Sequence, residues 1–241
     1  MATLVQRTLD EFTGPNVANL PRLPAVVPVP GADIRLSAES YFKFPDGTLL
    51  STWDDVYTGN VVSLTPAKTG ITGATRPELT RRGPHRVARF DGVKAATGVN
   101  YNRAEPFTLC MVVYCPVQLT NSFIATTIDS PTAFKGLGVE AGGLIKWWGN
   151  GVVTGPKLTP GWHFIGIIAD GLSTKLCLDN TIVGGAEAGT AYTRNKLNFG
   201  GSVHSTRFTQ IDIAEPINFP RALTEEELIQ VRTAYQLRYD L

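Results

Sequence analysis

The sequence predicts an all-β fold: an antiparallel two-sheet sandwich of the jelly-roll type, with one C-terminal α-helix and a proline-rich extended N-terminal arm. Many short segments rich in Val, Ile, Phe, Thr and Tyr are bounded by Gly, Pro, Asn or Asp, which is the pattern of such sandwiches. Only the last thirty residues show a helical pattern that we assign. The 241 residues fit one domain of this kind, so we assign the arm to residues 1–33 and the sandwich to residues 34–241.

The closing helix is expected over residues 224–239. Thr224 and Glu227 have the three-residue spacing of a capping box, in which each side chain binds the backbone N–H of the other. Pro220 ends the strand before it, so that Thr224 can begin the helix. One apolar stripe follows from residues three or four positions apart, namely Leu228, Val231, Tyr235 and Tyr239.

The expected strands are 87–90, 107–117, 122–128, 144–148, 163–169, 174–179, 196–200 and 208–219. Asp179-Asn180 is predicted to be a two-residue hairpin tip, because apolar residues alternate on both sides of it. Phe90 is predicted to pack inward, while Asp91-Gly92 turns the chain.

The arm is punctuated by proline, which fixes φ and removes a donor, so we expect an extended, polyproline-like segment. Its prolines are Pro15, Pro21, Pro24, Pro28 and Pro30. The apolar residues Leu20, Leu23, Val26 and Val27 lie between them. Two interpretations stand side by side: an arm that docks on a neighbouring subunit, and a strap over this chain's own sandwich.

A series of motifs appears in a particular order along the chain: Ser37–Phe42, Thr52–Asp55, Thr75–Leu79, Val87–Gly92, Pro106–Val113, Gly161–Phe164, Lys175–Asp179, Leu197–Gly201, and the strand and helix from Ile211 onward. The series resembles the laminin-G-like branch of the concanavalin A-like lectin/glucanase superfamily, as found in phage tail and virion structural proteins and in bacterial surface proteins. The resemblance covers residues 36–241. It implies a β-sandwich used for adhesion or recognition, often of glycans.

Gln210–Glu215 resembles the E-x-D-x-x-E signature of retaining glucanases on this fold. The position of the nucleophile is occupied by Gln210, and an amide cannot attack an anomeric carbon and leave again as a carboxylate. The histidines His85, His163 and His204 lack the spacing of a metal site, and His163 is expected to be exposed at a strand start. We therefore predict no catalytic residues, no bound metal and a protein that is not an enzyme.

Two segments are predicted as binding candidates for a glycan or a partner. In the first, adjacent strand residues face opposite ways, so one tryptophan should enter the core and the other should reach solvent, where an indole beside an amide can hold a sugar. These residues are Trp147, Trp148 and Asn150. The second is a polar and aromatic loop with Asn100, Tyr101 and Arg103. The alternative in both cases is that the side chains simply pack.

Composition excludes several partners. The formal net charge is +1, and the arginines between Arg76 and Arg89 are interpreted as a solvated loop and strand edge, so nucleic acid is not expected. No apolar run is long enough to insert into a membrane, and no signal peptide is visible. No cofactor is expected. Asp91, Asp129, Asp170 and Asp179 could supply oxygen ligands to calcium, but turn chemistry explains them better.

The three cysteines are predicted to be buried free thiols. Cys110 and Cys115 are five positions apart on one expected strand, which puts them about 16 Å apart on opposite faces and prevents a disulfide between them. Cys177 can pair with only one of them. Free thiols fit folding in a reducing compartment.

These observations lead to a hypothesis of a phage virion structural protein, a minor tail, tail-tip or fibre subunit, folded in the host cytoplasm. The arm would contact other virion subunits, the sandwich would face a host cell-wall glycan, and a homo-oligomer is expected. The alternatives are a stand-alone carbohydrate-binding lectin-like module and a divergent glycoside hydrolase that uses Glu215.

Overall fold

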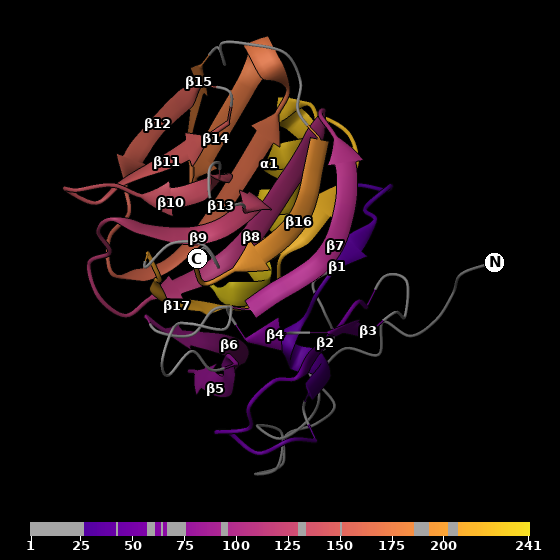
Figure 1. Cartoon of the computed structure of the whole chain (residues 1–241), viewed down its shortest axis with the longest axis vertical. Helices are drawn as coiled ribbons and strands as arrows, with labels where there is room; N and C mark the ends of the chain where they lie inside the picture. Colours follow the sequence, from indigo (N-terminus) through magenta and orange to yellow (C-terminus); the bar gives the residue numbers. More distant parts are fainter. Residues whose placement is uncertain are drawn as a thin grey trace.

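The computed structural model describes residues 27–41, 43–56, 61–63, 65–66, 76–92, 96–129, 134–149, 151–185, 193–201 and 207–241. Two antiparallel sheets lie face to face, and one α-helix packs on the outside of one of them (Figure 1). This arrangement confirms the predicted fold class.

The helix-bearing sheet has its strands in the order β15-β14-β13-β8-β17-β6-β5, and β18 joins β8 to β1. The strands are β15 (Thr181–Gly185), β14 (Thr174–Leu178), β13 (Gly161–Ala169), β8 (Phe107–Cys115), β17 (Gln210–Ile213), β6 (His85–Asp91), β5 (Glu78–Arg82), β18 (Ile217–Phe219) and β1 (Ile34–Arg35). β13 and β8 form its centre, with every residue of one paired to a residue of the other.

The facing sheet has the order β12-β11-β10-β9-β16-β7-β4. Its strands are β12 (Val152–Lys157), β11 (Leu144–Trp148), β10 (Phe134–Val139), β9 (Ser122–Asp129), β16 (Thr193–Phe199), β7 (Ala96–Ala104) and β4 (Thr65–Pro66). A separate hairpin pairs β2 (Thr52–Asp54) with β3 (Val61–Ser63). Short 3₁₀ turns follow β1 at η3 (Ala38–Tyr41) and precede β14 at η4 (Gly171–Ser173).

The main core lies between the two sheets and follows the two-residue period of the strands. Phe90, Phe107 and Trp147 are among its largest fully buried side chains. Phe90 therefore packs inward, as the sequence predicts. Cys115 also points into this core, on the inner face of β8.

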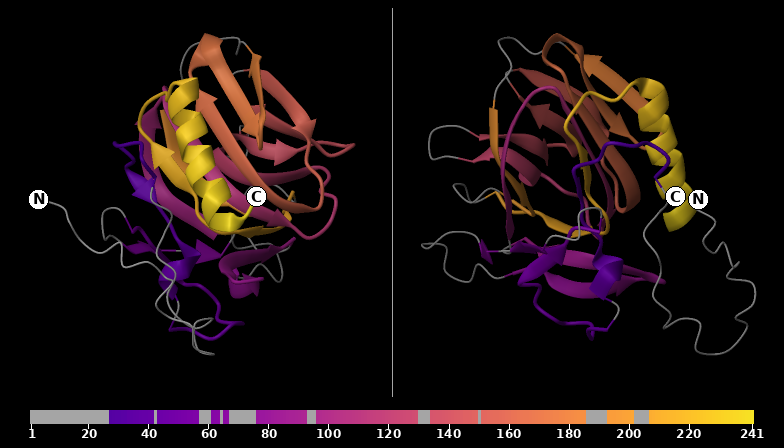
Figure 2. Two further views of the ribbon diagram at one scale, coloured as in Figure 1. Left: turned by 180° about the vertical axis from the view of Figure 1, so that it is seen from behind. Right: turned by 90° about the vertical axis from the view of Figure 1, so that its right-hand side faces the viewer.

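The helix α1 (Glu225–Tyr239) lies on the outer face of the helix-bearing sheet (Figure 2). A second core of buried side chains lies beneath it. The predicted apolar stripe of the helix is buried here, and Thr224 and Glu227 form the predicted capping box. Gly166 is the direct strand partner of both Cys110 and Cys177, and a Cβ at Gly166 would lie 2.9 Å from Leu228 Cδ1. The missing side chain therefore makes room for the helix between two buried thiols.

The described end of the proline-rich arm packs on this same chain. Val29 and Ala32 are buried in the second core, and Val27 contacts it. Residues 1–26 lie outside the described residues, so docking of the arm on a neighbouring subunit stays a prediction.

The structure contradicts two local predictions. The segment with Asn100, Tyr101 and Arg103 is not a loop but part of β7, where Asn100 pairs with Lys196 and Arg103 with Arg194 of β16. The polar residues of this segment interrupt the alternation of apolar and polar residues from which a strand is predicted. His163 is not exposed but buried, for reasons that its hydrogen bonds make clear below. The hairpin tip at Asp179-Asn180 is confirmed, with Leu178 paired to Thr181.

Candidate functional site

A line of polar and aromatic side chains crosses the outer face of the helix-bearing sheet, beyond the C-terminal end of α1. Direct register pairs connect residues on five neighbouring strands: Trp162, Tyr114, Asp212, Arg89 and Glu78. Their sequence neighbours Val113, Ile213 and Ala88 point into the main core, so alternation puts the line on the outer face. Four strand spacings give it a length of about 19 Å. We call these residues, together with Arg82, the outer-face row.

The charged half of the outer-face row is built around a buried carboxylate. Arg82 Nε binds Asp212 Oδ2, and Arg89 Nε lies 3.4 Å from Asp212 Oδ1. Asp212 is only 1 % exposed, whereas the side chains of Arg82 and Arg89 are 28 % and 32 % exposed. Burial raises the pKa of Asp212 above its ordinary value, and the two guanidinium groups offset only part of this effect.

The aromatic half of the row is half-buried and continues into the helix. The ring of Trp162 lies 5.4 Å from that of Tyr114 and 5.6 Å from that of Tyr239, and His85 packs edge-on to it at 5.8 Å. Arg82 lies over the Tyr114 ring, 4.7 Å from its centroid. This cation–π contact joins the two halves of the row.

Tyr239 connects the row to a buried ionic network. Its hydroxyl donates to Glu215 Oε2 at 3.0 Å, and Arg35 Nε donates to Glu215 Oε1 at 2.7 Å. Glu215 has no exposed side-chain surface. Burial raises the pKa of Glu215, with Arg35 opposing the shift. The helix end, the β17–β18 connection and β1 are thus held together beneath the aromatic half of the row.

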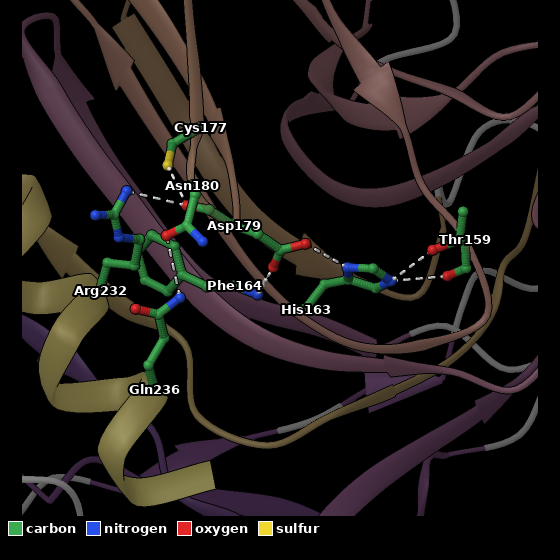
Figure 3. A network of polar contacts seen from close by, with 8 residues as sticks. All are labelled: Thr159, His163, Phe164, Cys177, Asp179, Asn180, Arg232 and Gln236. Atoms are coloured by element: carbon green, nitrogen blue, oxygen red, sulfur yellow. Dashed lines mark hydrogen bonds and ion pairs between the residues drawn. The ribbon is translucent and has the colours of Figure 1, made fainter. Parts of the chain in front are cut away.

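A second polar network ties the β14–β15 hairpin to β13 and α1 (Figure 3). Asp179, at φ +50° in the hairpin tip, accepts from the backbone N–H of Phe164 at 2.9 Å and binds His163 Nδ1 at 2.7 Å. His163 Nε2 lies 2.8 Å from the backbone oxygen of Thr159. Arg232 of α1 donates to the Asp179 carbonyl at 3.2 Å.

The chemistry of His163 follows from its neighbours. A carboxylate and a backbone carbonyl only accept, so both ring nitrogens must donate and the imidazole is protonated. Despite burial, its contact with Asp179 raises the pKa of His163. Thr159 Oγ1 lies 3.5 Å from Nε2, but the proton on that nitrogen prevents it from acting as a base toward the hydroxyl. The network is therefore a structural tie.

The sequence-predicted binding residues do not meet at one site. Trp147 is buried in the main core, which removes it from the ligand-binding candidates. Trp148 lies on the outer face of the facing sheet, with its ring 5.3 Å from Phe123 and exposed Val152 as its strand partner. One tryptophan in and one out is the predicted arrangement.

The remaining candidates fall outside what the structure describes. Asn150 is not among the described residues, and for Asn100, Tyr101 and Arg103 only the backbone in β7 is described. A glycan or partner role for these residues, and for Trp148, stays a prediction.

The glucanase-like segment does not form an open pair of acids. Gln210 is exposed, Asp212 is held by two arginines, and Glu215 is buried against Arg35. Asp179, one of the turn residues considered for calcium, uses its carboxylate on His163 and Phe164. Within the described ranges, no group of three or more His, Cys, Asp or Glu could hold a metal ion. No helix in those ranges is both long and apolar enough to span a bilayer.

Sequence reasoning missed the outer-face row as a site. It interpreted Arg82 and Arg89 as a solvated edge and Asp212 as part of an ordinary strand. One signal was available: in Gln210–Ile213 a charged residue alternates with two isoleucines that face the core, so Asp212 had to point out of the sandwich.

Comparison with known proteins identifies solved structures with a similar fold. No family model matches the chain, and no curated protein matches it. Domain 4 of AbnA, a GH43 extracellular arabinanase from Geobacillus stearothermophilus, solved in complex with arabinotriose, is similar with a TM-score of 0.63 and 14 % identity, covering 85 % of this chain and 98 % of that one.

Two longer enzymes are also similar. Trypanosoma rangeli sialidase in complex with sialic acid has a TM-score of 0.62 and 16 % identity, covering 90 % of this chain. A GH54 α-L-arabinofuranosidase variant soaked with 4-nitrophenyl α-L-arabinofuranoside has a TM-score of 0.61 and 10 % identity, covering 85 % of this chain. The present chain spans 36 % of the sialidase chain and 58 % of the arabinofuranosidase chain. At these identities the likeness establishes a shared sandwich fold.

These structures correct the prediction that the protein is not an enzyme. All three come from carbohydrate-active enzymes. The fold therefore occurs within such enzymes, and the missing nucleophile at Gln210 was too narrow a ground for predicting that this protein is not one. They also give no support to the phage tail context. The virion location, the virion partners and the homo-oligomer are untested by these comparisons.

Proposed function

We propose that this chain binds carbohydrate through the outer-face row, in the setting of a carbohydrate-active enzyme. The observation that carries the proposal is the row itself: two half-buried aromatic rings in line with two arginines held by a buried carboxylate. Aromatic faces contact the apolar side of a sugar ring, and fixed polar groups orient its hydroxyls.

The comparisons support the proposal in one respect. The arabinanase domain was solved with a bound oligosaccharide, and the match spans nearly all of that domain. A module of this size and fold can therefore hold a glycan without further domains. The arabinofuranose class is a reasonable first ligand to test, alongside other neutral oligosaccharides.

Trp162→Ala is expected to weaken binding of the best neutral oligosaccharide tenfold or more, about 1.4 kcal/mol, because it removes the half-buried ring at the end of the row. Titration calorimetry of the full chain against a panel that includes arabinotriose measures this loss. Urea unfolding of the same variant checks that the fold persists, and Tyr114→Leu serves as a second variant.

Trp148→Ala is the matched control, since it removes a partly exposed tryptophan from the other sheet. Full affinity in Trp148→Ala together with lost affinity in Trp162→Ala supports the row. The reverse result would place the site on the facing sheet, and a panel with no binder would refute glycan binding altogether. Hydrolysis of each bound oligosaccharide is measured in parallel, because the similar structures come from glycosidases.

A further inference from the structure

The two arginines of the outer-face row contact the buried carboxylate of Asp212 in the same orientation. Both approach Asp212 through Nε, from β5 and from β6. A guanidinium group has five N–H donors, of which four are on the terminal nitrogens. Beyond the contacts with Asp212 and the Tyr114 ring, the side chains of Arg82 and Arg89 make no further hydrogen bond or ion pair in the described part of the chain.

The carboxylate of Asp212 and the two guanidinium groups differ in their exposure to solvent. The carboxylate of Asp212 is inaccessible, whereas both guanidinium side chains are about one-third exposed at 28 % and 32 %. The inner edge of each guanidinium therefore faces the carboxylate, which hydrogen-bonds Arg82 and forms an ion pair with Arg89, and the outer donors are available to a ligand. Such a pre-oriented pair loses little side-chain entropy when a ligand binds.

The chemistry of the donors selects the ligand. Terminal guanidinium nitrogens bind a planar carboxylate through two parallel N–H···O bonds, which are stronger than bonds to neutral hydroxyls. Glu78 stands opposite Arg89 as the second acid of the row. Selectivity must therefore come from placed donors at Arg82 and Arg89 rather than from a large positive potential.

We propose that the outer-face row prefers oligosaccharides that carry carboxylate groups, with a sugar ring against Tyr114 and Trp162 and an adjacent carboxylate on Arg82 and Arg89. This inference rests on the glycan binding proposed above and names its ligand class. The aromatic and charged halves are neighbours in the row, because Arg82 lies over the Tyr114 ring. A single acidic sugar unit can therefore touch both.

The test uses a matched pair of ligands: tetragalacturonate and its fully methyl-esterified form, which keeps the backbone and removes the charge. The full chain is expected to bind the acid at least tenfold more tightly than the ester, which corresponds to one charge-assisted hydrogen bond. The preference should shrink as salt is raised, because partly exposed charges are screened.

Variants assign the preference to the arginines. Arg89→Gln should abolish the difference between acid and ester, because it lowers the affinity for the acid by a larger factor than the affinity for the ester. Arg89→Lys should restore only part of it, since an ammonium lacks the bidentate fork. Arg81→Gln is the control: Arg81 is equally exposed at 32 %, but it faces Asp46 at 3.6 Å instead of the row.

The outcomes separate the two proposals. Equal affinity for acid and ester, or a preference that survives Arg89→Gln, overturns the carboxylate preference while glycan binding stands. Binding of neutral oligosaccharides without binding of tetragalacturonate would also overturn the carboxylate preference while glycan binding stands. Failure of every ligand in both panels overturns glycan binding, and the present inference with it.

Discussion

His163 of β13 is hydrogen-bonded both to the β14–β15 hairpin tip and to the segment that precedes β13. Its two nitrogens face the carboxylate of Asp179 and the carbonyl of Thr159, so the hydrogen-bond geometry requires the protonated form. The pKa of His163 is raised accordingly. Folding thus takes up a proton that the unfolded chain releases near its ordinary value of about 6.5.

The stability of the protein should depend on pH through His163. The contribution is fully present below about pH 6.5 and is lost as the pH rises through the raised pKa of the folded state. Urea unfolding between pH 5.5 and 8, below the range in which unfolded cysteines ionise, measures this decline with His163→Gln beside the unsubstituted chain. His163→Gln should flatten it, whereas Asn180→Ala, in the same hairpin tip, should keep it. An unchanged decline in His163→Gln would contradict the protonated state.

At the scale of elements, α1 is positioned by a glycine on the strand below it. The helix begins at its own capping box, but its place on the sheet depends on Leu228 sitting over Gly166. A side chain at this position would fill the space that the helix occupies. Helix formation and helix docking therefore have separate causes in this chain.

Gly166→Val is expected to destabilise the protein by about 1–3 kcal/mol, the usual effect of overpacking, because its Cβ would lie 2.9 Å from Leu228 Cδ1. Equilibrium urea unfolding measures the loss. Gly184→Val in β15 is the control, since a Cβ there meets nothing within 4 Å. Similar losses in both variants would show that strand glycines, not helix docking, determine the effect.

At the scale of the whole molecule, the Arg35–Glu215–Tyr239 network joins segments that are far apart in the sequence. Arg35 comes from β1, Glu215 from the β17–β18 connection and Tyr239 from the last turn of α1. A buried ion pair contributes little net stability, but removing one partner leaves a buried charge without compensation.

Arg35→Met should therefore cost about 3–5 kcal/mol at pH 8 and clearly less at pH 5. Without Arg35, the already raised pKa of Glu215 rises further, so the folded state retains a proton and loses stability as the pH increases. Urea unfolding at the two pH values measures the difference. Lys175→Met breaks an exposed pair with Glu225 and should cost less than about 1 kcal/mol at both. An equal cost of Arg35→Met at both pH values would contradict this account.

The features that the sequence predicted differ in a physical way from those that it missed. Thr224 with Glu227, and the hairpin tip at Asp179, depend on contacts within a few residues, so local spacing is sufficient to predict them. The outer-face row depends on the register of five strands, which brings Glu78 beside Arg89 and Asp212 beside Tyr114. Pairing at that sequence distance cannot be derived from spacing alone.

The cysteines lie on both sides of the helix-bearing sheet, and this makes them natural reporters of partial opening. Burial raises the pKa of Cys177 to about 11 and that of Cys115 to about 12, which suppresses the reactive thiolate in the closed protein. Detachment of the helix alone would uncover Cys110 and Cys177, whereas Cys115 would react only when the two sheets separate. The order of thiol modification under mild denaturant therefore distinguishes fraying of the C-terminal helix from global unfolding, without any introduced label.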